Sequence, residues 1–234
     1  MQDFLEYLFN KYGYDPKFIR QIAVGQRYIA VELVNGNIGV CATLSYNYKK
    51  GIPKEVFPEI YSDRLFLTAY YNALLNYRTY PVENNKDIYD LKLENYRQIV
   101  FIGKFDPVFE KLRQRDIKYS YIDLRDTLSH DNQINNKEQL LSIADLLIIS
   151  ATAITNQTLN EIIENSPYSE KYILGPSSIL SPDLSQWGIN GIFGLQFNPY
   201  DSRVLGVISL NYGTRYFIHR GNKVLLKCKF MNTI

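Results

Sequence analysis

The most regular hydrophobic pattern in the chain lies at residues 144–150, where four consecutive apolar residues follow Asp145. A continuous apolar run of this length is typical of a parallel strand that is buried on both faces. A polar loop follows at residues 150–158, and the capping-box spacing of Thr158 and Glu161 predicts that a helix begins there. We therefore expect a strand, a loop and a helix in that order, with the loop at the carboxyl end of the strand.

Small polar side chains fill this loop, and ligands of open α/β sheets collect at the carboxyl ends of the strands. Thr152, Thr155, Asn156 and Thr158 are therefore candidate ligand contacts. The alternative is that they only close the turn and cap the helix, which threonine and asparagine commonly do.

The first 80 residues predict a small α+β unit. Apolar residues at helical spacing predict a helix over residues 4–12. Two β-rich segments then flank Asn35-Gly36, the dipeptide best suited to a tight hairpin turn. A second helix is expected over residues 62–77, with Ser62 as its N-cap. Antiparallel strands with helices packed on them form a unit of this class.

Residues 78–97 carry a proline, paired asparagines and no steady period, as a linker between domains does. We place the boundary near Asn85, which divides the chain into residues 1–85 and 86–234. Beyond it strand and helix patterns alternate, which favours a parallel sheet with crossover helices, the Rossmann-like class. The expected strands are residues 98–103, 118–125, 144–150, 171–177 and 191–197, and the tail predicts a hairpin or edge strands around Gly221-Asn222.

Two further strand ends carry candidate ligand contacts. The first βα turn runs from Gly103 to Pro107 and has one glycine where pyrophosphate recognition needs three, so a usual dinucleotide site is not expected. Asp123 ends the second strand about 20 residues after Gly103, where Rossmann-type proteins hold an acid for ribose hydroxyls, although aspartate is also a common turn residue. A third turn, at residues 175–178, can present hydroxyl and N–H groups to an anion or a carboxylate. Its residues are Gly175, Pro176, Ser177 and Ser178.

Composition and charge limit the class of partner. The chain has 234 residues, of which 46% are hydrophobic and 21% charged, as is typical of a globular protein with a sizeable core. The net charge is +2, with 26 basic and 24 acidic residues scattered along the chain, so no nucleic-acid partner is expected. No apolar run reaches the roughly 18 residues of a membrane span, and Asp3 and Glu6 stand where a signal peptide would carry positive charge. We therefore expect a cytoplasmic protein with no membrane partner.

Residues that hold soft metals or act as catalytic bases are sparse. Cys41 and Cys228 lie far apart without CxxC spacing, which suits a reducing compartment and excludes a thiolate metal cluster. His130 lies in the stretch of residues 129–139, which is predicted to be a solvated loop, and His219 is far from it in the sequence. Two isolated histidines are more often surface residues than a base and its partner. The sequence contains no HExxH or GxSxG motif. It thus offers no catalytic constellation that can be placed in space.

Several motifs together resemble those of the putative heavy-metal chelation family. They are FIGKFDP, YIDL, ADLLIISATAITNQTL, YILGPSS and a late Gly213-Thr214, in the order and approximate spacing of that family. The segment IAVGQRYIAVEL resembles part of the family's first domain. The resemblance covers most of the chain and implies an enolase-N-terminal-like domain followed by a Rossmann-like domain, with a site in the cleft between them.

The resemblance also carries the family's site residues onto this chain. They map to Thr152, Thr155, Asn156, Thr158, Gly175, Pro176, Ser177, Gly103 and Phe105. Two departures concern the shapes of the loops. Ser150-Ala151 replaces the glycine-rich start of the Thr/Asn loop, and Asp106 displaces an expected proline to Pro107.

We therefore expect the interdomain cleft to bind a small polar molecule, which the resemblance implies can chelate a metal. The alternatives are an enzyme, a transferase or lyase that uses a nucleotide-like cofactor with Asp123 on its ribose, and an interaction scaffold with a degenerate cleft. The expected partner is a small-molecule ligand, and a homodimer is left open. Because the thiolates and imidazoles are isolated, any metal is expected to arrive in an organic chelate or to lie weakly on oxygen ligands such as Asp106 or Asp123.

Overall fold

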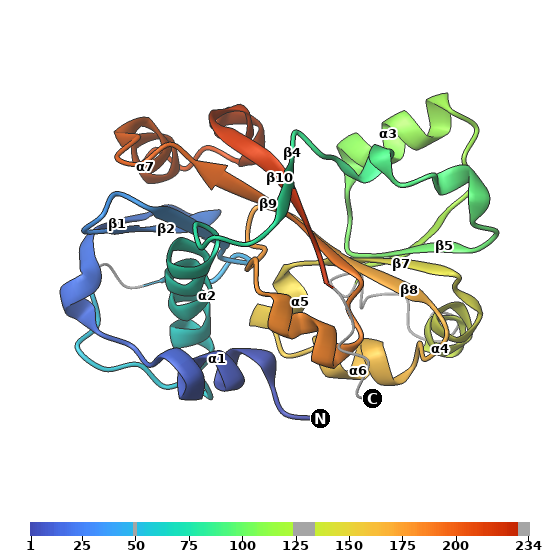
Figure 1. Ribbon diagram of the computed structural model, residues 1–234, viewed down its shortest axis with the longest axis horizontal. Helices are drawn as coiled ribbons and strands as arrows, with labels where there is room; N and C mark the ends of the chain where they lie inside the picture. Colours follow the sequence, from blue (N-terminus) through green and yellow to red (C-terminus); the bar gives the residue numbers. More distant parts are fainter. Residues whose placement is uncertain (49–50, 124–133, 229–234) are drawn as a thin grey trace.

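The computed structural model describes residues 1–48, 51–123 and 134–228, whose strands form two sheets. The small sheet is antiparallel and joins β1 (Ile19–Val24), β2 (Tyr28–Leu33) and β3 (Ile38–Ala42). The large sheet has seven strands, in the spatial order β4 (Val82–Asn84), β10 (Gly221–Lys227), β9 (Gly191–Phe197), β8 (Glu170–Leu174), β7 (Leu146–Ser150), β5 (Ile99–Ile102) and β6 (Ser120–Ile122). From β9 to β6 the strands run parallel, whereas β10 is antiparallel to both β9 and β4. A mostly parallel sheet with a smaller antiparallel one confirms the predicted α/β class (Figure 1).

The predicted features at the start of the chain are present. Helix α1 (Phe4–Tyr12) is capped by the carboxylate of Asp3 and ends at Gly13, whose φ of 65° suits glycine. The hairpin predicted at Asn35-Gly36 joins the paired strands β2 and β3. Gly36 there has φ 87°, which a residue with a side chain rarely adopts.

Helix α2 (Tyr61–Leu75) covers one face of the small sheet. It packs so closely on β3 that a Cβ atom on Gly39 would lie 2.2 Å from the carbonyl oxygen of Ala69, so the contact requires glycine. The prediction that Ser62 caps this helix is wrong, because Ile60 occupies the N-cap and Ser62 lies inside the first turn. There its hydroxyl donates to the carboxylate of Asp63 at 3.4 Å.

Both faces of the large sheet are buried. Phe101 and Ile148 pack on the side of α3 (Asp106–Gln114), while Ile102 and Ile149 face the opposite side. That side carries α4 (Ile134–Ile143), α5 (Thr152–Thr155) and α6 (Leu159–Glu164), as Figure 1 shows. Residues 134–139, expected to be part of a solvated loop, belong to α4 instead. Among the described residues, no helix combines the length and the hydropathy needed to cross a membrane.

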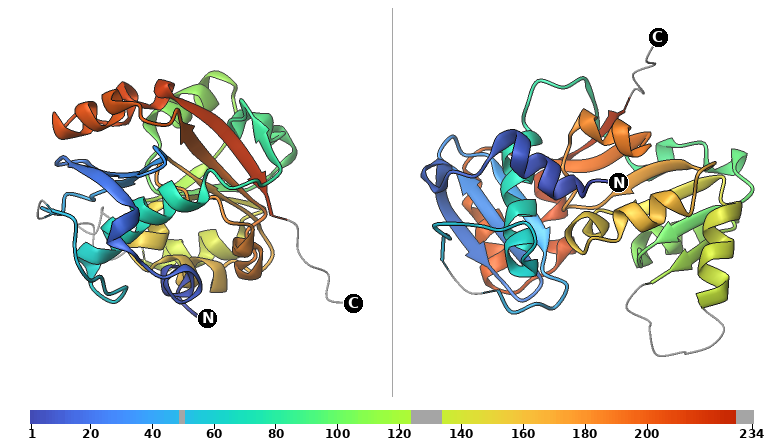
Figure 2. Two further views of the ribbon diagram at one scale, coloured as in Figure 1. Left: turned by 60° about the vertical axis from the view of Figure 1, so that its left-hand side comes forward. Right: turned by 90° about the horizontal axis from the view of Figure 1, so that it is seen from below.

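The last part of the chain returns to the small sheet before it completes the large one. After β9, helix α7 (Ser202–Ser209) packs on β1 and β2 and covers the face opposite α2. Figures 1 and 2 both show this helix alongside the blue strands. The chain then forms β10 between β9 and β4, so the hairpin or edge strands predicted around Gly221-Asn222 are wrong. Short 3-10 turns lie at Pro16–Phe18, Ile88–Asp90, Leu93–Asn95, Pro182–Trp187, Thr214–Tyr216 and Ile218–Arg220.

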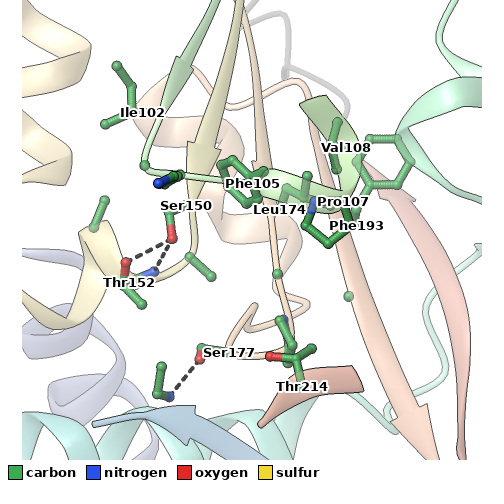
Figure 3. A pocket seen from close by; sticks show the side chains of 18 of the residues that line it. Ile102, Phe105, Pro107, Val108, Ser150, Thr152, Leu174, Ser177, Phe193 and Thr214 are labelled. Atoms are coloured by element: carbon green, nitrogen blue, oxygen red, sulfur yellow. Dashed lines mark hydrogen bonds between the residues drawn. The ribbon is translucent and has the colours of Figure 1, made fainter. Parts of the chain in front are cut away.

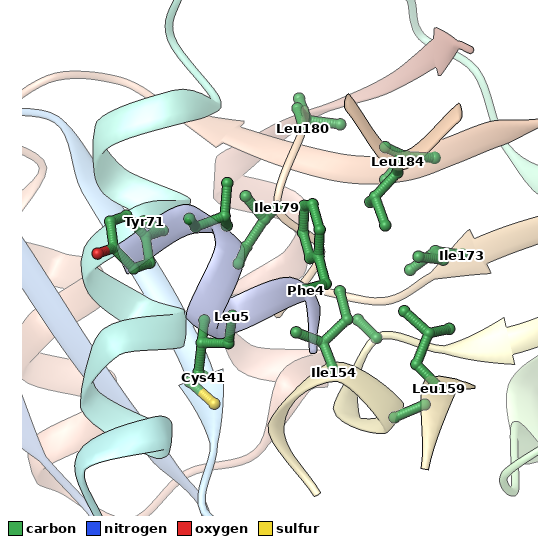
Figure 4. Close-up of a cluster of buried hydrophobic side chains, with 14 of the residues drawn as sticks. Phe4, Leu5, Cys41, Tyr71, Ile154, Leu159, Ile173, Ile179, Leu180 and Leu184 are labelled. Atoms are coloured by element: carbon green, nitrogen blue, oxygen red, sulfur yellow. The ribbon is translucent and has the colours of Figure 1, made fainter. Parts of the chain in front are cut away.

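One hydrophobic core connects the two sheets. Figure 4 shows Phe4 and Leu5 of α1 and Tyr71 of α2 in the same cluster as Ile154 of α5 and Ile173 of β8. All of these side chains are almost fully buried. The shared core fixes the small sheet against the large one, and the division of the chain near residue 85 stays a prediction.

Candidate functional site

A cavity of about 520 Å³ lies between the small sheet and the carboxyl ends of β5, β7 and β8. In Figure 3, Ser150 and Thr152 lie on one side of it, Phe105 and Pro107 on another, and Ser177 lies near the small sheet. The strand order places β6 and β7 on opposite sides of β5, and ligands of doubly wound sheets bind at such a reversal. The volume suits a small molecule, because ligand pockets span roughly 300–1,000 Å³.

All but two of the residues predicted as ligand contacts line this cavity. Those that line it are Gly103, Phe105, Asp123, Thr152, Asn156, Thr158, Gly175, Pro176 and Ser177. Thr155 and Ser178 are buried behind the wall, and the hydroxyl oxygen of Thr155 lies 3.1 Å from that of Thr68. The fold thus brings together loops that lie far apart in the sequence, and their contact with a ligand stays a prediction.

Hydroxyl and amide groups in the loop after β7 contact one another at the cavity wall. The hydroxyl oxygens of Ser150 and Thr152 lie 2.8 Å apart. Asn156 Oδ1 accepts hydrogen bonds from the backbone N–H of Thr158 at 3.3 Å and from its hydroxyl at 2.8 Å, which leaves the Asn156 amide nitrogen to donate to a ligand. The predicted capping box is wrong, because Thr158 makes no side-chain bond to the backbone of α6 and the Glu161 carboxylate forms an ion pair elsewhere.

Arg64 of α2 holds the far end of this loop in place. The side chain is fully buried, and its five N–H groups all donate hydrogen bonds. Nε donates to the carbonyl of Thr155 at 2.8 Å and Nη2 to that of Ile154 at 2.6 Å. The remaining groups bind both carboxylate oxygens of Asp3 and the carbonyl of Pro58. One side chain therefore ties the Thr/Asn loop to α1 and α2.

The turn after β8 is attached to both β3 and α2. Gly175 has φ 139°, a conformation that favours glycine. Ser177 Oγ accepts the backbone N–H of Ala42 at 3.0 Å, and Asn72 Nδ2 donates to the carbonyl of Pro176 at 2.9 Å. Because a hydroxyl both accepts and donates, Ser177 can accept from β3 and still donate to a ligand oxygen.

The turn after β5 brings a glycine against the loop after β7. Gly103 has φ 107°, and a Cβ atom there would lie 3.0 Å from the Cβ of Ser150. Helix α3 follows and opens with Asp106 and Pro107. Proline has no N–H and aspartate adds negative charge, so the start of α3 is a poor phosphate site. This geometry agrees with the missing dinucleotide fingerprint.

Sequence reasoning missed the cavity residues that lie outside the strand-end loops. They include a pair of hydroxyl groups, Tyr28 and Thr214, whose oxygens lie 2.7 Å apart, and burial raises the pKa of Tyr28. Thr214 belongs to the Gly213-Thr214 motif, to which the sequence assigned no function. Four lysines also line the cavity: Lys86, Lys104, Lys111 and Lys223. Lys104 lies in the predicted turn after β5, whereas no local motif marks the other three, which reach the cavity through the pairing of β10 with β4 and through α3.

Residues that could hold a soft metal do not gather in the described parts of the chain, where no three His, Cys, Asp or Glu side chains form a group able to hold an ion. Cys41 and Cys228 are free and buried. Burial raises the pKa of each thiol to about 12, so neither is a thiolate at neutral pH. His219 lies in a 3-10 turn, and His130 lies outside the described residues. The donors described here do not fit a heavy-metal site made by the protein alone.

Comparisons with known proteins identify relatives in both sequence and fold. The model of the DUF364 family, described as "Putative heavy-metal chelation", matches residues 87–227. A DUF364-family protein of unknown function from Desulfitobacterium hafniense DCB-2 is 18% identical, with a TM-score of 0.73 over 95% of this chain and 96% of that chain. Another from Pyrococcus horikoshii is also 18% identical, with a TM-score of 0.70 over 89% and 92%. No curated protein matches the chain. At these identities the two structures show a shared fold.

Proposed function

Since the chain belongs to the DUF364 family of putative heavy-metal chelation, we propose that its cavity binds a small polar molecule able to chelate a metal ion. One observation carries the proposal. The loops after β5, β7 and β8 meet the small sheet around a single cavity of about 520 Å³, at the position where α/β sheets of this order bind ligands.

The chemistry of the wall supports a polar ligand with an apolar body. Hydroxyl groups of Ser150, Thr152 and Ser177 and the amide of Asn156 supply hydrogen-bond donors and acceptors along the wall. Leu174 and other apolar side chains supply the rest of the lining. Such sites combine a mostly apolar wall with a few placed polar groups, which set the orientation of the ligand.

In this proposal the metal is bound by the ligand and not by protein thiolates. Soft metals need thiolates or imidazoles in a cluster, and the described residues provide none. Hydroxyl and amide groups bind an organic chelator through its oxygen atoms, which leaves the chelator's own donors on the metal. The family description and the scarcity of metal ligands are then compatible.

A ligand panel read by thermal unfolding tests the proposal. The panel contains citrate and pyridine-2,6-dicarboxylate, each with and without Ni²⁺, together with AMP and ATP. A ligand at 100 times its Kd should stabilise the fold by roughly 2.7 kcal/mol, which raises Tm by roughly 5–10 °C in a chain of this size.

The substitution Asn156→Ala separates a ligand contact from a structural role. It should abolish the ligand-induced rise in Tm and lower the free energy of unfolding of the ligand-free protein by at most about 1 kcal/mol. Asn165→Ala is the matched control, because Asn165 ends α6 away from the cavity lining and should leave the rise unchanged. An equal rise in wild type and Asn156→Ala would contradict the proposal, and a much larger loss of stability would make Asn156 structural.

A second candidate is an enzyme, a transferase or lyase that uses a nucleotide-like cofactor in the same cavity. Asp123 favours it, because this residue follows β6 and lines the cavity where an acid can meet ribose hydroxyls. The start of α3 argues against a phosphate there. The AMP and ATP arms of the panel decide, since no stabilisation by either nucleotide removes this candidate.

A further inference from the structure

The charged residues on the cavity wall are mostly cationic. Among the residues that the structure describes, four lysines line the cavity against two carboxylates, Asp87 and Asp123. The four lysines are Lys86, Lys104, Lys111 and Lys223. The excess is local, because the whole chain carries a net charge of only +2. A cavity wall with an excess of one sign of charge favours ligands of the other sign.

Two of these lysines are adjacent because β10 pairs with the segment that begins at β4. The backbone N–H of Lys86 donates to the carbonyl of Lys223 at 3.3 Å. Lys223 Nζ forms an ion pair with Asp87, whereas Lys86 Nζ lies 3.5 Å from the carboxylate of Asp90. Asp90 is outside the cavity lining. Lys86 Nζ also lies 4.0 Å from the carboxylate of Glu83, which is likewise outside the cavity lining, so both of these carboxylate partners are residues that do not line the cavity.

Lys111 adds a cation to the cavity wall from a different element, helix α3. Its Nζ lies 4.8 Å from the centre of the Tyr89 ring, a cation-π contact at the cavity wall. Arg115 also contacts this ring, at 5.0 Å. In the part of the chain that the structure describes, no carboxylate lies within ion-pair distance of Lys111. Lys111 is thus a cation at the cavity whose described partner is an aromatic face.

We propose that the molecule bound in this cavity is an organic oxyanion. Its two or more carboxylate or phosphate groups pair with Lys111 and with Lys86 and Lys223. This inference rests on the proposed function and specifies the ligand class of the same cavity. Lys86, Lys104 and Lys223 each pair with a carboxylate of the protein, whereas within the described residues Lys111 meets only an aromatic face. An oxyanion in the cavity supplies an anionic partner for Lys111 and forms charge-assisted hydrogen bonds with it. The same oxygens that pair with lysine are hard ligands that a chelator also uses for metals.

Isothermal titration with matched probes tests the ligand class. Pyridine-2,6-dicarboxylate carries two negative charges, and pyridine-2,6-dicarboxamide keeps the ring without them. Pyrophosphate tests whether phosphate replaces carboxylate. We expect at least one of the two anions to bind, and the dicarboxamide to bind at least about 10-fold more weakly than the dicarboxylate, the scale of charge-assisted over neutral hydrogen bonds.

Variants of Lys111 connect that preference to the wall. Lys111→Gln should lower the affinity for the anion by about 5–10-fold, and Lys111→Arg should retain most of that affinity because it keeps the charge. Lys17→Gln is the matched control, since Lys17 is exposed in the turn before β1 and is not part of the cavity lining. Raising the salt concentration from 25 to 200 mM should weaken the wild type more than Lys111→Gln.

The outcomes separate this inference from the proposed function. Equal affinity for the dicarboxylate and the dicarboxamide overturns the oxyanion class. An affinity for the anion that Lys111→Gln leaves unchanged overturns it as well. If that binding is still lost in Asn156→Ala, the cavity binds a ligand and only the charge inference fails. Binding of neither anion also overturns the inference, whatever neutral ligands the cavity accepts.

Discussion

Arg64 provides the sharpest test of how the loop at the cavity is held. Arg64→Met keeps much of the side-chain volume and removes all five hydrogen bonds described above. The carbonyls of Ile154 and Thr155, at the end of the Thr/Asn loop, then lose a donor, and so does the carbonyl of Pro58. Asp3 loses its buried partner but keeps the N–H groups at the start of α1.

The magnitude follows from burial. Arg64 is 0% exposed, and breaking a buried ion pair by removing one partner costs about 3–5 kcal/mol. The Asp3 side chain is 19% exposed, so water recovers part of that loss and the lower end applies. We expect a loss of about 3 kcal/mol in the free energy of unfolding, a large share of the 5–15 kcal/mol typical of a folded protein.

Urea unfolding followed by tyrosine and tryptophan fluorescence measures this loss. With a slope of roughly 2–3 kcal/mol/M, the midpoint should fall by roughly 1–1.5 M. Arg203→Met is the control, because that arginine also pairs with an aspartate but is 69% exposed, and it should cost less than about 1 kcal/mol. A midpoint for Arg64→Met that matches the Arg203→Met value would refute the reasoning that this guanidinium holds the loop.

Three further predictions concern packing, pH and metal uptake. Gly39→Ala places a Cβ atom 2.2 Å from the backbone of α2 and should lower the free energy of unfolding by about 3 kcal/mol or more. Gly206→Ala in α7 meets nothing within 4 Å and should raise it by up to about 1 kcal/mol. Urea unfolding midpoints compare the two variants, and equal effects would contradict the close contact of Gly39 with α2. Burial raises the pKa of Cys41 and Cys228 from 9.0 to about 12, so the unfolded thiols ionise first and stability should fall by about 1 kcal/mol for each thiol per pH unit from about pH 9 to 12. Cys41→Ser should reduce the difference in the free energy of unfolding between pH 8 and pH 10, and an unchanged difference contradicts this assignment. The double variant Cys41→Ser with Cys228→Ser should leave metal uptake unchanged.

The strand-end loops were predictable because each depends on a local pattern. A buried apolar run followed by polar residues marks both the end of a strand and the loop that leaves it, which is why Thr152 and Asn156 were found. Thr155 has the same composition signal, but its hydroxyl meets Thr68, 87 residues earlier in the chain. Its burial depends on α2 packing against α5, which no local pattern contains.

The meeting of Lys86 with Lys223 and the place of β10 in the sheet were not predictable for a related reason. Gly221-Asn222 has the composition of a turn, yet pairing with β9 and β4 makes it the start of an interior strand. That pairing also brings Lys223 to Lys86, whose neighbours in the sequence read as a linker. Capping was the other failure, since Thr158 bonds Asn156 and not the helix. Alternative hydrogen-bond partners of a hydroxyl compete at similar energies, so spacing alone does not select one.

The position of α7 has a consequence for synthesis on the ribosome. The small sheet leaves the ribosome early, but the face that Ala30 and Val40 present is covered by Val204, Ile208 and Phe217, which follow much later. At 5–20 residues per second, that face waits on the order of ten seconds for its cover. During this interval the nascent chain exposes an apolar surface next to the free edge of β1, the kind of surface that chaperones bind. The apolar face formed by the first fifth of the chain is therefore protected from aggregation only after the last fifth has been synthesised and has packed on it.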